Sequence, residues 1–138
     1  MTPFSRHIAR SLLKEPKIYF FDTGLVKGDL GAKFENLVAT CLLKHIFAKT
    51  DYLAENYVLH YFHTKEKREV DFVLVCDNRI EKLIEVKHAD SSIDPSLRYF
   101  HEKYQFPAVQ VVKELKRERT DNNIQVVQGV NFLKSLYL

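Results

Sequence analysis

The stretch Glu69-Val-Asp-Phe-Val-Leu-Val-Cys-Asp-Asn-Arg-Ile-Glu-Lys-Leu-Ile-Glu-Val-Lys87 decides the fold. Two apolar runs flank its central Asp77-Asn78, and Asp and Asn are favoured where a tight turn needs special backbone angles. The stretch therefore predicts a β-hairpin. It also carries Asp71, Glu85 and Lys87 within apolar strands. Isolated charges in buried strands cost on the order of several kcal/mol unless they are paired or bind a metal.

The register of this hairpin decides whether the three charges meet. If the turn is centred on Asn78, Asp71 lies directly opposite Glu85, and opposed residues share a face with Cβ atoms about 4.5–5.5 Å apart. Lys87 is two residues beyond Glu85 and points to the same face. A slip of one residue would send Asp71 to the other face, so an even-length turn without a bulge would separate the two carboxylates.

Two carboxylates this close raise each other's pKa unless a cation lies between them. Lys87 compensates in part, and Mg²⁺ or Mn²⁺ would compensate further, because these ions take oxygen ligands and commonly use one or two protein carboxylates. Such an ion polarises a phosphate and lowers the pKa of water, while a lysine neutralises developing charge. The alternative is that these charges form the wet face of a half-exposed antiparallel sheet, and the residues alone leave both readings open.

Length and composition bound the remaining possibilities. The 138 residues predict one domain over residues 17–138, with residues 1–16 as a lead-in or the tail of a preceding domain. The net charge of +3 permits a nucleic-acid partner without demanding one. Cys41 and Cys76 lie in apolar runs, which favours free, buried thiols in a reducing cytoplasm. No apolar stretch approaches the length of a membrane span, and the first residues do not resemble a signal peptide.

The hydrophobic pattern predicts an α/β fold with a mixed central sheet flanked by helices, in the order αβββαβ. An apolar stripe predicts the first helix, and Glu35 lies at its edge, where a solvated position is favoured. The predicted strands are residues 17–22, 57–63, 69–76, 79–87, 109–112 and 124–127, and the predicted helices are 32–47, 96–104 and 129–136.

At these residues the chain resembles the PD-(D/E)XK nuclease superfamily, whose motif is an acid, a spacer and then acid-x-Lys, often with a Glu on the first helix. It looks most like the uncharacterised C-terminal domain found behind a AAA-type ATPase module in many predicted prokaryotic ATPases. The likeness rests on residues 16–25, 31–38, 69–73 and 84–87, which follow one another in the same order.

The resemblance implies a restriction-endonuclease-like core. It also implies a role for each residue of the site. Asp71 and Glu85 would bind Mg²⁺ or Mn²⁺ with the Val86 carbonyl as a third ligand. Lys87 would be the catalytic lysine, and Glu35 the auxiliary acid of the first helix. The implied partners are a nucleic acid and an AAA-type ATPase module, and a homo-oligomer is left open. No Walker A motif is present, so the chain is expected to be a fragment or stand-alone remnant rather than the ATPase itself.

Two functions remain open on the sequence. One is a divalent-metal-dependent nuclease-like domain that hydrolyses phosphodiester bonds in DNA or RNA. The other is a catalytically inactive module of such an ATPase that binds nucleic acid or protein, because a fold does not establish a function. The basic segments 65–68 and 113–119 would suit a nucleic-acid backbone, although charge runs of mixed sign are more typical of a solvated face.

Overall fold

The structure, a computed structural model, describes residues 2–3 and 28–136. Its helices are α1 (Leu30–Leu53), α2 (Pro95–Tyr104) and α3 (Gly129–Ser135). Its strands are β1 (Thr2–Pro3), β2 (Tyr57–His63), β3 (Glu69–Cys76), β4 (Arg79–Lys87), β5 (Ala108–Val112), β6 (Arg119–Asp121) and β7 (Ile124–Gln128).

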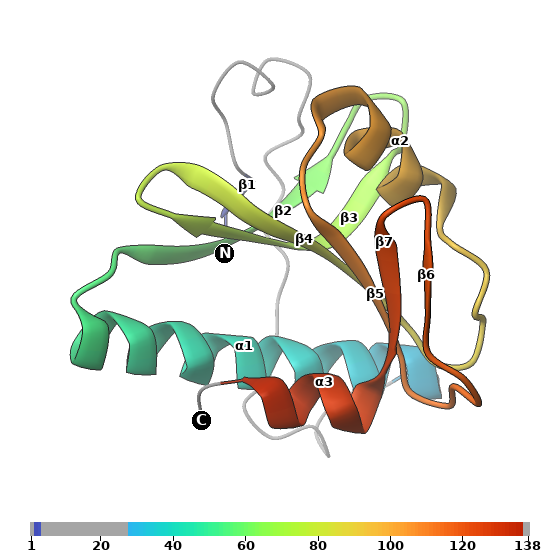
Figure 1. Ribbon diagram of the computed structural model, residues 1–138, viewed down its shortest axis with the longest axis horizontal. Coiled ribbons are helices and arrows are strands. Elements are labelled where there is room, and N and C mark those ends of the chain that lie inside the picture. The colour runs from blue at the N-terminus through green and yellow to red at the C-terminus, as the bar shows by residue number, and fades with distance from the viewer. Residues whose placement is uncertain (1, 4–27, 137–138) are drawn as a thin grey trace.

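The strands form one mixed sheet in the order β1-β2-β3-β4-β5-β7-β6. Strands β2, β3 and β4 are antiparallel neighbours, whereas β4, β5 and β7 run parallel. Helices α1 and α3 cover one face and α2 covers the other (Figure 1). The predicted α/β class, the mixed sheet flanked by helices and the order αβββαβ are confirmed.

Each face of the sheet has its own hydrophobic core. Phe34, Val38 and Leu42 of α1 pack on the first face together with Phe132 of α3. Phe100 belongs to the second core, beneath α2. Both faces of the central strands are therefore buried, and a charged side chain in those strands must find partners inside the protein.

The first helix is longer than the sequence predicts. It begins at Leu30, after Asp29 accepts a hydrogen bond from the Ala32 N–H at 2.8 Å, and it ends at Leu53, before Ala54 with a φ of 54°. The last turns carry exposed side chains such as Tyr52, which interrupt the apolar stripe. A periodicity that fades before the helix ends explains the prediction of 32–47.

The β3–β4 turn is a correction to the predicted geometry. It is not centred on Asn78 alone: Asp77 and Asn78 form a two-residue turn with φ values of 49° and 66°, and Cys76 pairs with Arg79. Asp and Asn tolerate these left-handed angles, as a hairpin turn of this length requires. An even-length turn of this kind would by itself send Asp71 and Glu85 to opposite faces.

A β-bulge restores the register. Val75 pairs with Ile80 but Leu74 pairs with Lys82, so Glu81 is an extra residue on β4. Beyond this bulge Phe72 faces Ile84, and continuing this register would place Asp71 opposite Glu85. The turn and the bulge each shift the pairing by one residue, and together they keep the carboxylates on one face.

The predicted strands agree with the structure to different degrees. The strands over 57–63, 69–76 and 79–87 are confirmed to the residue. Strand β6 was missed, because its Arg119–Asp121 belongs to a charged segment and pairs only with β7 through the two-residue turn Asn122-Asn123. The predicted strand 17–22 and the domain boundary at residue 16 lie outside the described residues.

Two expectations concern the environment of the protein. Cys41 and Cys76 are free, as predicted, but both are half-buried rather than buried. Within residues 28–136, the helices are too short or too polar to cross a bilayer. A cytoplasmic location stays a prediction.

Candidate functional site

The two strands that carry the predicted site part from each other at Asp71. The β3–β4 ladder ends at the pair Phe72–Ile84, although β4 continues to Lys87. On its other side β3 also departs from regular pairing with β2, where Asp71 and Phe72 together oppose Tyr61. Bulges of this kind re-aim side chains and are common next to active sites. Asp71 therefore lies where the central strands β3 and β4 separate, near the carboxyl end of β4.

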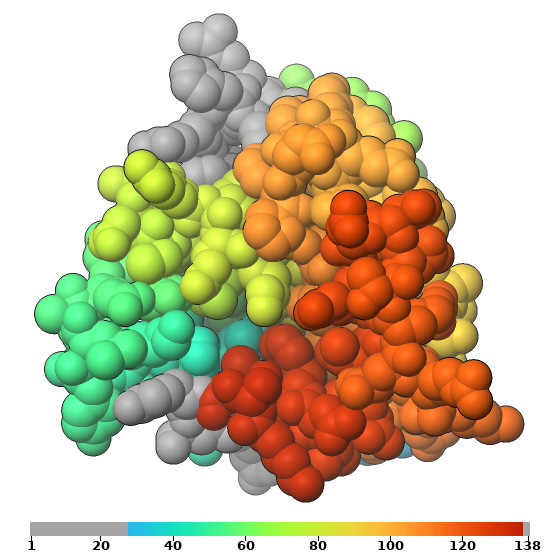
Figure 2. Space-filling view, viewed as in Figure 1, coloured from blue at the N-terminus to red at the C-terminus, as the bar shows by residue number. Residues whose placement is uncertain are grey.

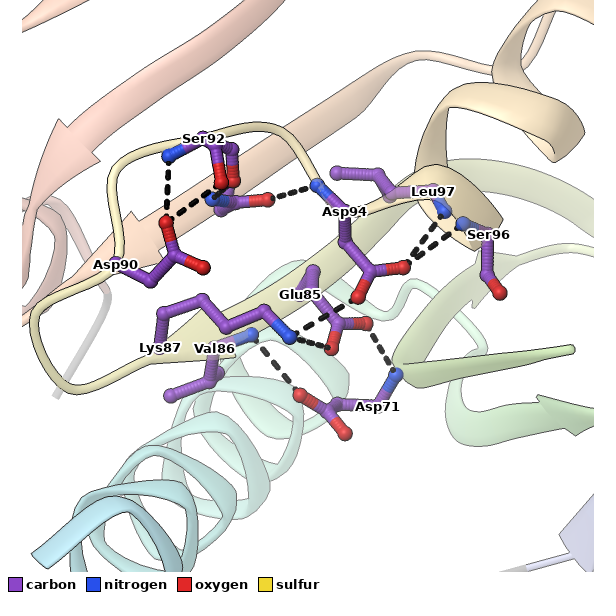
Figure 3. A network of polar contacts seen from close by, with 10 residues as sticks. Asp71, Glu85, Val86, Lys87, Asp90, Ser92, Asp94, Ser96 and Leu97 are labelled. Atoms are coloured by element: carbon purple, nitrogen blue, oxygen red, sulfur yellow. Dashed lines mark hydrogen bonds and ion pairs between the residues drawn. The ribbon is translucent and has the colours of Figure 1, made fainter.

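At this opening the carboxylates replace the missing ladder bonds. The Val86 N–H donates to Asp71 Oδ2 at 2.9 Å, and the Asp71 N–H donates to Glu85 Oε2 at 3.2 Å (Figure 3). A main-chain N–H of each strand thus donates a hydrogen bond to a carboxylate of the other strand. The predicted convergence of Asp71 and Glu85 is what the structure contains, reached by a different turn.

Lys87 joins this pair from the same face. Its Nζ lies 3.6 Å from Glu85 Oε1 and 3.0 Å from Asp94 Oδ2 (Figure 3). Asp94 was not among the predicted site residues. Its Oδ1 accepts hydrogen bonds from the N–H groups of Ser96 and Leu97, so it also caps the N-terminus of α2.

A buried glutamine holds Asp94 in place. Gln110 of β5 is fully buried and pairs with Glu85 in the parallel β4–β5 ladder, so the two side chains share a face. Its Oε1 accepts the Asp94 N–H at 2.9 Å and its Nε2 donates to the Ser92 carbonyl at 2.7 Å. The loop after β4 is therefore anchored to β5, and Lys87 faces a fixed carboxylate.

The electrostatics of the cluster are dominated by Glu85. Its side chain is only 6% exposed, and burial, followed by the negative charges of Asp71 and Asp94, raises its pKa far above the usual range. Burial acts to lower the pKa of Lys87, but the hydrogen bond to Asp94 and the charge of Glu85 outweigh it and raise this pKa. The acids outnumber the lysine, so a further cation is favourable here.

The donor set fits a hard divalent cation. Residues 28–136 hold no preformed group of three His, Cys, Asp or Glu side chains for a metal, so the candidate ligands are two carboxylates and a main-chain carbonyl. The Val86 N–H points toward Asp71, and the carbonyl of a strand residue points to the same side as its N–H. One or two carboxylates with a carbonyl and several waters are a common Mg²⁺ shell.

Glu35 is the predicted site residue that comes from a helix and not from the β3–β4 hairpin. It lies in the second turn of α1, half-buried, on the helix that covers the opposite face from α2. Its role as an auxiliary acid stays a prediction.

The fold and this cluster define an α/β domain whose acids and lysine meet where two central strands diverge. The family model described as "Domain of unknown function (DUF4143)" matches residues 30–132. The chain therefore belongs to this family, which is commonly found with AAA-type ATPases. No curated protein and no solved structure gives a significant match.

The two tasks of Asp94 can be separated by mutation. Asp94→Ala removes both the helix cap and the partner of Lys87, and is expected to lower the free energy of unfolding by about 1–3 kcal/mol. Asp94→Asn keeps a good capping oxygen and removes only the charge, so we expect a loss below about 1 kcal/mol. Urea denaturation of both variants measures the difference. Equal losses would mean that the cap contributes nothing.

Proposed function

We propose that this domain is a divalent-metal-dependent nuclease-like domain that hydrolyses phosphodiester bonds in DNA or RNA. The observation that carries the proposal is the convergence of Asp71, Glu85, the Val86 main chain and Lys87 at the opening between β3 and β4. Acid, acid and lysine in this order are also the pattern by which the chain resembles the PD-(D/E)XK superfamily. The same likeness suggests Mg²⁺ or Mn²⁺ as the cofactor.

Each residue has a distinct task in this proposal. Asp71 and Glu85 would hold the metal with the Val86 carbonyl, and the bound metal would polarise the phosphate and lower the pKa of its water. Lys87 would offset the charge that develops on the phosphate oxygens, since its ammonium already faces the carboxylates. Asp94 keeps the Lys87 side chain extended toward the site through its 3.0 Å contact.

The family association suggests the setting of this activity. Because the family is commonly found with AAA-type ATPases, we further propose that the domain acts beside such an ATPase module on a nucleic acid. The ATPase would supply motion along the substrate and the present domain would supply the chemistry.

A second candidate is a module that binds but does not cut. One observation favours it: Glu85 is almost fully buried and Lys87 is already paired with two carboxylates. A cluster whose lysine is already paired in this way can persist for its structural value alone. The two candidates make different predictions about divalent metal.

A cleavage assay tests the proposal. Plasmid, single-stranded DNA and RNA are incubated with the chain in Mg²⁺, Mn²⁺ or EDTA, beside Asp71→Asn and the control Asp51→Asn. Asp51 is an exposed acid near the end of α1. We expect cleavage only with metal, retained by Asp51→Asn and lost by Asp71→Asn, because an amide is a poor ligand for a hard cation.

The pattern of results distinguishes the candidates. Cleavage that is equal in wild type and Asp71→Asn comes from a contaminant or another site and would contradict the proposal. Salt-dependent binding of nucleic acid with no cleavage in either metal supports the binding module instead.

A further inference from the structure

A groove lies beside the carboxylate site, between the loops that follow β4 and β5. Its volume is about 370 Å³, and it is lined by Ala89, Ser91, Glu114, Leu115, Lys116, Arg117 and Arg119. Figure 2 shows these two segments at one edge of the molecule, the loop after β4 in yellow and the segment after β5 in orange. The groove begins two residues beyond Lys87, so it adjoins the proposed site along the chain.

The topology places this groove where ligands commonly bind. Strands β4 and β5 are parallel neighbours, and both loops leave their carboxyl ends. In α/β sheets the crevice outside the carboxyl ends of parallel strands is the usual binding position. The antiparallel β3 begins at the same end, which is why Asp71 also lies there. The site and the groove therefore lie at the same end of the central strands.

The cations of the groove are available to a ligand. Lys116 and Arg117 are exposed, and within the described residues neither side chain takes part in a hydrogen bond or an ion pair. The acid among the lining residues, Glu114, has its Oε1 3.5 Å from His88 Nε2. The carboxylate of Glu118 accepts the Gln128 N–H at 2.8 Å. Among the lining residues, Lys116, Arg117 and Arg119 outnumber the acid Glu114, so the groove has a net positive charge.

The walls of the groove are held in position without a ligand. Arg119 Nη2 donates to the Ser91 carbonyl at 2.6 Å and ties one loop to the other. The Glu114 N–H donates to the His88 carbonyl at 2.9 Å. A preformed groove loses little conformational entropy when it binds.

We propose that this groove binds phosphate groups of the nucleic-acid strand on which the neighbouring site acts. Exposed Lys and Arg side chains without partners are the groups that neutralise backbone phosphates, and Arg binds a phosphate in a bidentate manner. The inference rests on the proposed function for the identity of the ligand. A second basic segment, Lys65–Arg68, joins β2 to β3 at the same end of the sheet. The acids of the site therefore lie between two basic segments. A nucleic-acid strand held in the groove would pass these acids.

Binding in EDTA tests the groove without any cleavage. The full chain is titrated into fluorescently labelled single-stranded DNA, the matching RNA and the matching duplex, over a range of salt concentrations. We expect Lys116→Gln/Arg117→Gln to reduce the slope of log K against log salt by about 1.4 for a single strand and about 1.8 for a duplex. At about 0.15 M salt the affinity should fall roughly ten-fold.

The matched control also removes two exposed cations. Lys44→Gln/Arg79→Gln changes one lysine on α1 and one arginine at the β3–β4 turn, which lies at the opposite end of the sheet from the groove. We expect its slope and affinity to equal those of the wild type within a factor of two or so. Equal changes in both double variants, no change in either, or no measurable binding by the wild type would overturn the proposal.

This experiment separates the groove from the nuclease proposal. If binding depends on the groove but the chain cleaves nothing in Mg²⁺ or Mn²⁺, the groove proposal is supported and the nuclease proposal is contradicted. If cleavage depends on Asp71 but binding does not depend on Lys116 and Arg117, the nuclease proposal is supported and the groove proposal is contradicted. The preference among the three labelled substrates then shows whether the strand is DNA or RNA, single or paired.

Discussion

Lys87→Met is expected to lower the rate of metal-dependent cleavage by roughly 10²- to 10³-fold, the usual effect of removing one group that stabilises transition-state charge. Met preserves the length and the apolar stem of a side chain that is 29% exposed. Metal binding should persist or become tighter, because a cation 3.6 Å from Glu85 Oε1 has been removed. This split between chemistry and metal affinity is the signature of a catalytic lysine.

Two measurements establish the split. Single-turnover cleavage gives the rate of the chemical step, and titration calorimetry with Mn²⁺ gives the affinity for the metal. Lys82→Met, on the same strand, is the control and should change neither. Asp71→Asn should lose both. A Lys87→Met enzyme that cuts as fast as Lys82→Met would mean that Lys87 serves structure and not chemistry.

The same comparison decides between the two candidate functions. In a binding module, Lys87 would only balance the charge of Asp94, 3.0 Å from its Nζ, and Lys87→Met would then lower stability in EDTA. Added Mn²⁺ would restore that stability if the carboxylates bind metal, since the ion replaces the lost ammonium. Stability that is lost and never restored by metal would indicate a purely structural cluster.

The hairpin shows how much of the site the sequence could predict. Strand limits and the meeting of Asp71 with Glu85 followed from apolar runs, an Asp-Asn turn and the two-residue period of a strand. The two residues meet through a different hairpin geometry from the predicted one, because a bulge at Glu81 compensates for the even-length turn. A bulge depends on which register buries the apolar side chains on both faces, and this is a tertiary property that no local pattern contains.

The missed residues have the same explanation. Asp94 precedes a proline and opens a helix, so its local pattern indicates a cap and nothing more. Its contact with Lys87 depends on Gln110, which comes from a strand that the sequence predicts only as apolar. One signal was present: a glutamine inside the run Ala108–Val112 is a buried amide that needs partners. The groove at Lys116 and Arg117 arises likewise from two loops that only the sheet order brings together.

The metal-free domain should lose stability as the pH rises from about 5 to about 8. Burial, with the charges of Asp71 and Asp94, raises the pKa of Glu85 far above its ordinary value of 4.5. The folded state therefore keeps a proton that the unfolded chain loses. Stability from this group is complete below the unfolded pKa and is lost as the pH climbs toward the folded one, by up to about 1.4 kcal/mol per pH unit.

Glu85→Gln should remove this dependence, because the amide carries no titrating proton. Lys87 does not contribute, since its pKa lies above its ordinary value and outside this range. Glu102→Gln, which changes an exposed acid on α2, is the matched control. Urea denaturation in EDTA at about pH 5, 6.5 and 8 measures the three proteins. A wild type that parallels Glu85→Gln at every pH would show that Glu85 is ionised without metal.

Divalent metal should abolish this loss of stability for the wild type. A metal ligand must be ionised, so binding releases the proton of Glu85, and the affinity for Mg²⁺ must rise with pH. In saturating Mg²⁺ the stability should consequently stay nearly constant from about pH 5 to about pH 8, because the metal-bound folded state and the unfolded chain both hold Glu85 without its proton. A gap between the EDTA and Mg²⁺ curves that widens as the pH rises requires one buried carboxyl that exchanges a proton for a metal. A cluster that merely neutralises itself would give curves that coincide, whatever its affinity for nucleic acid.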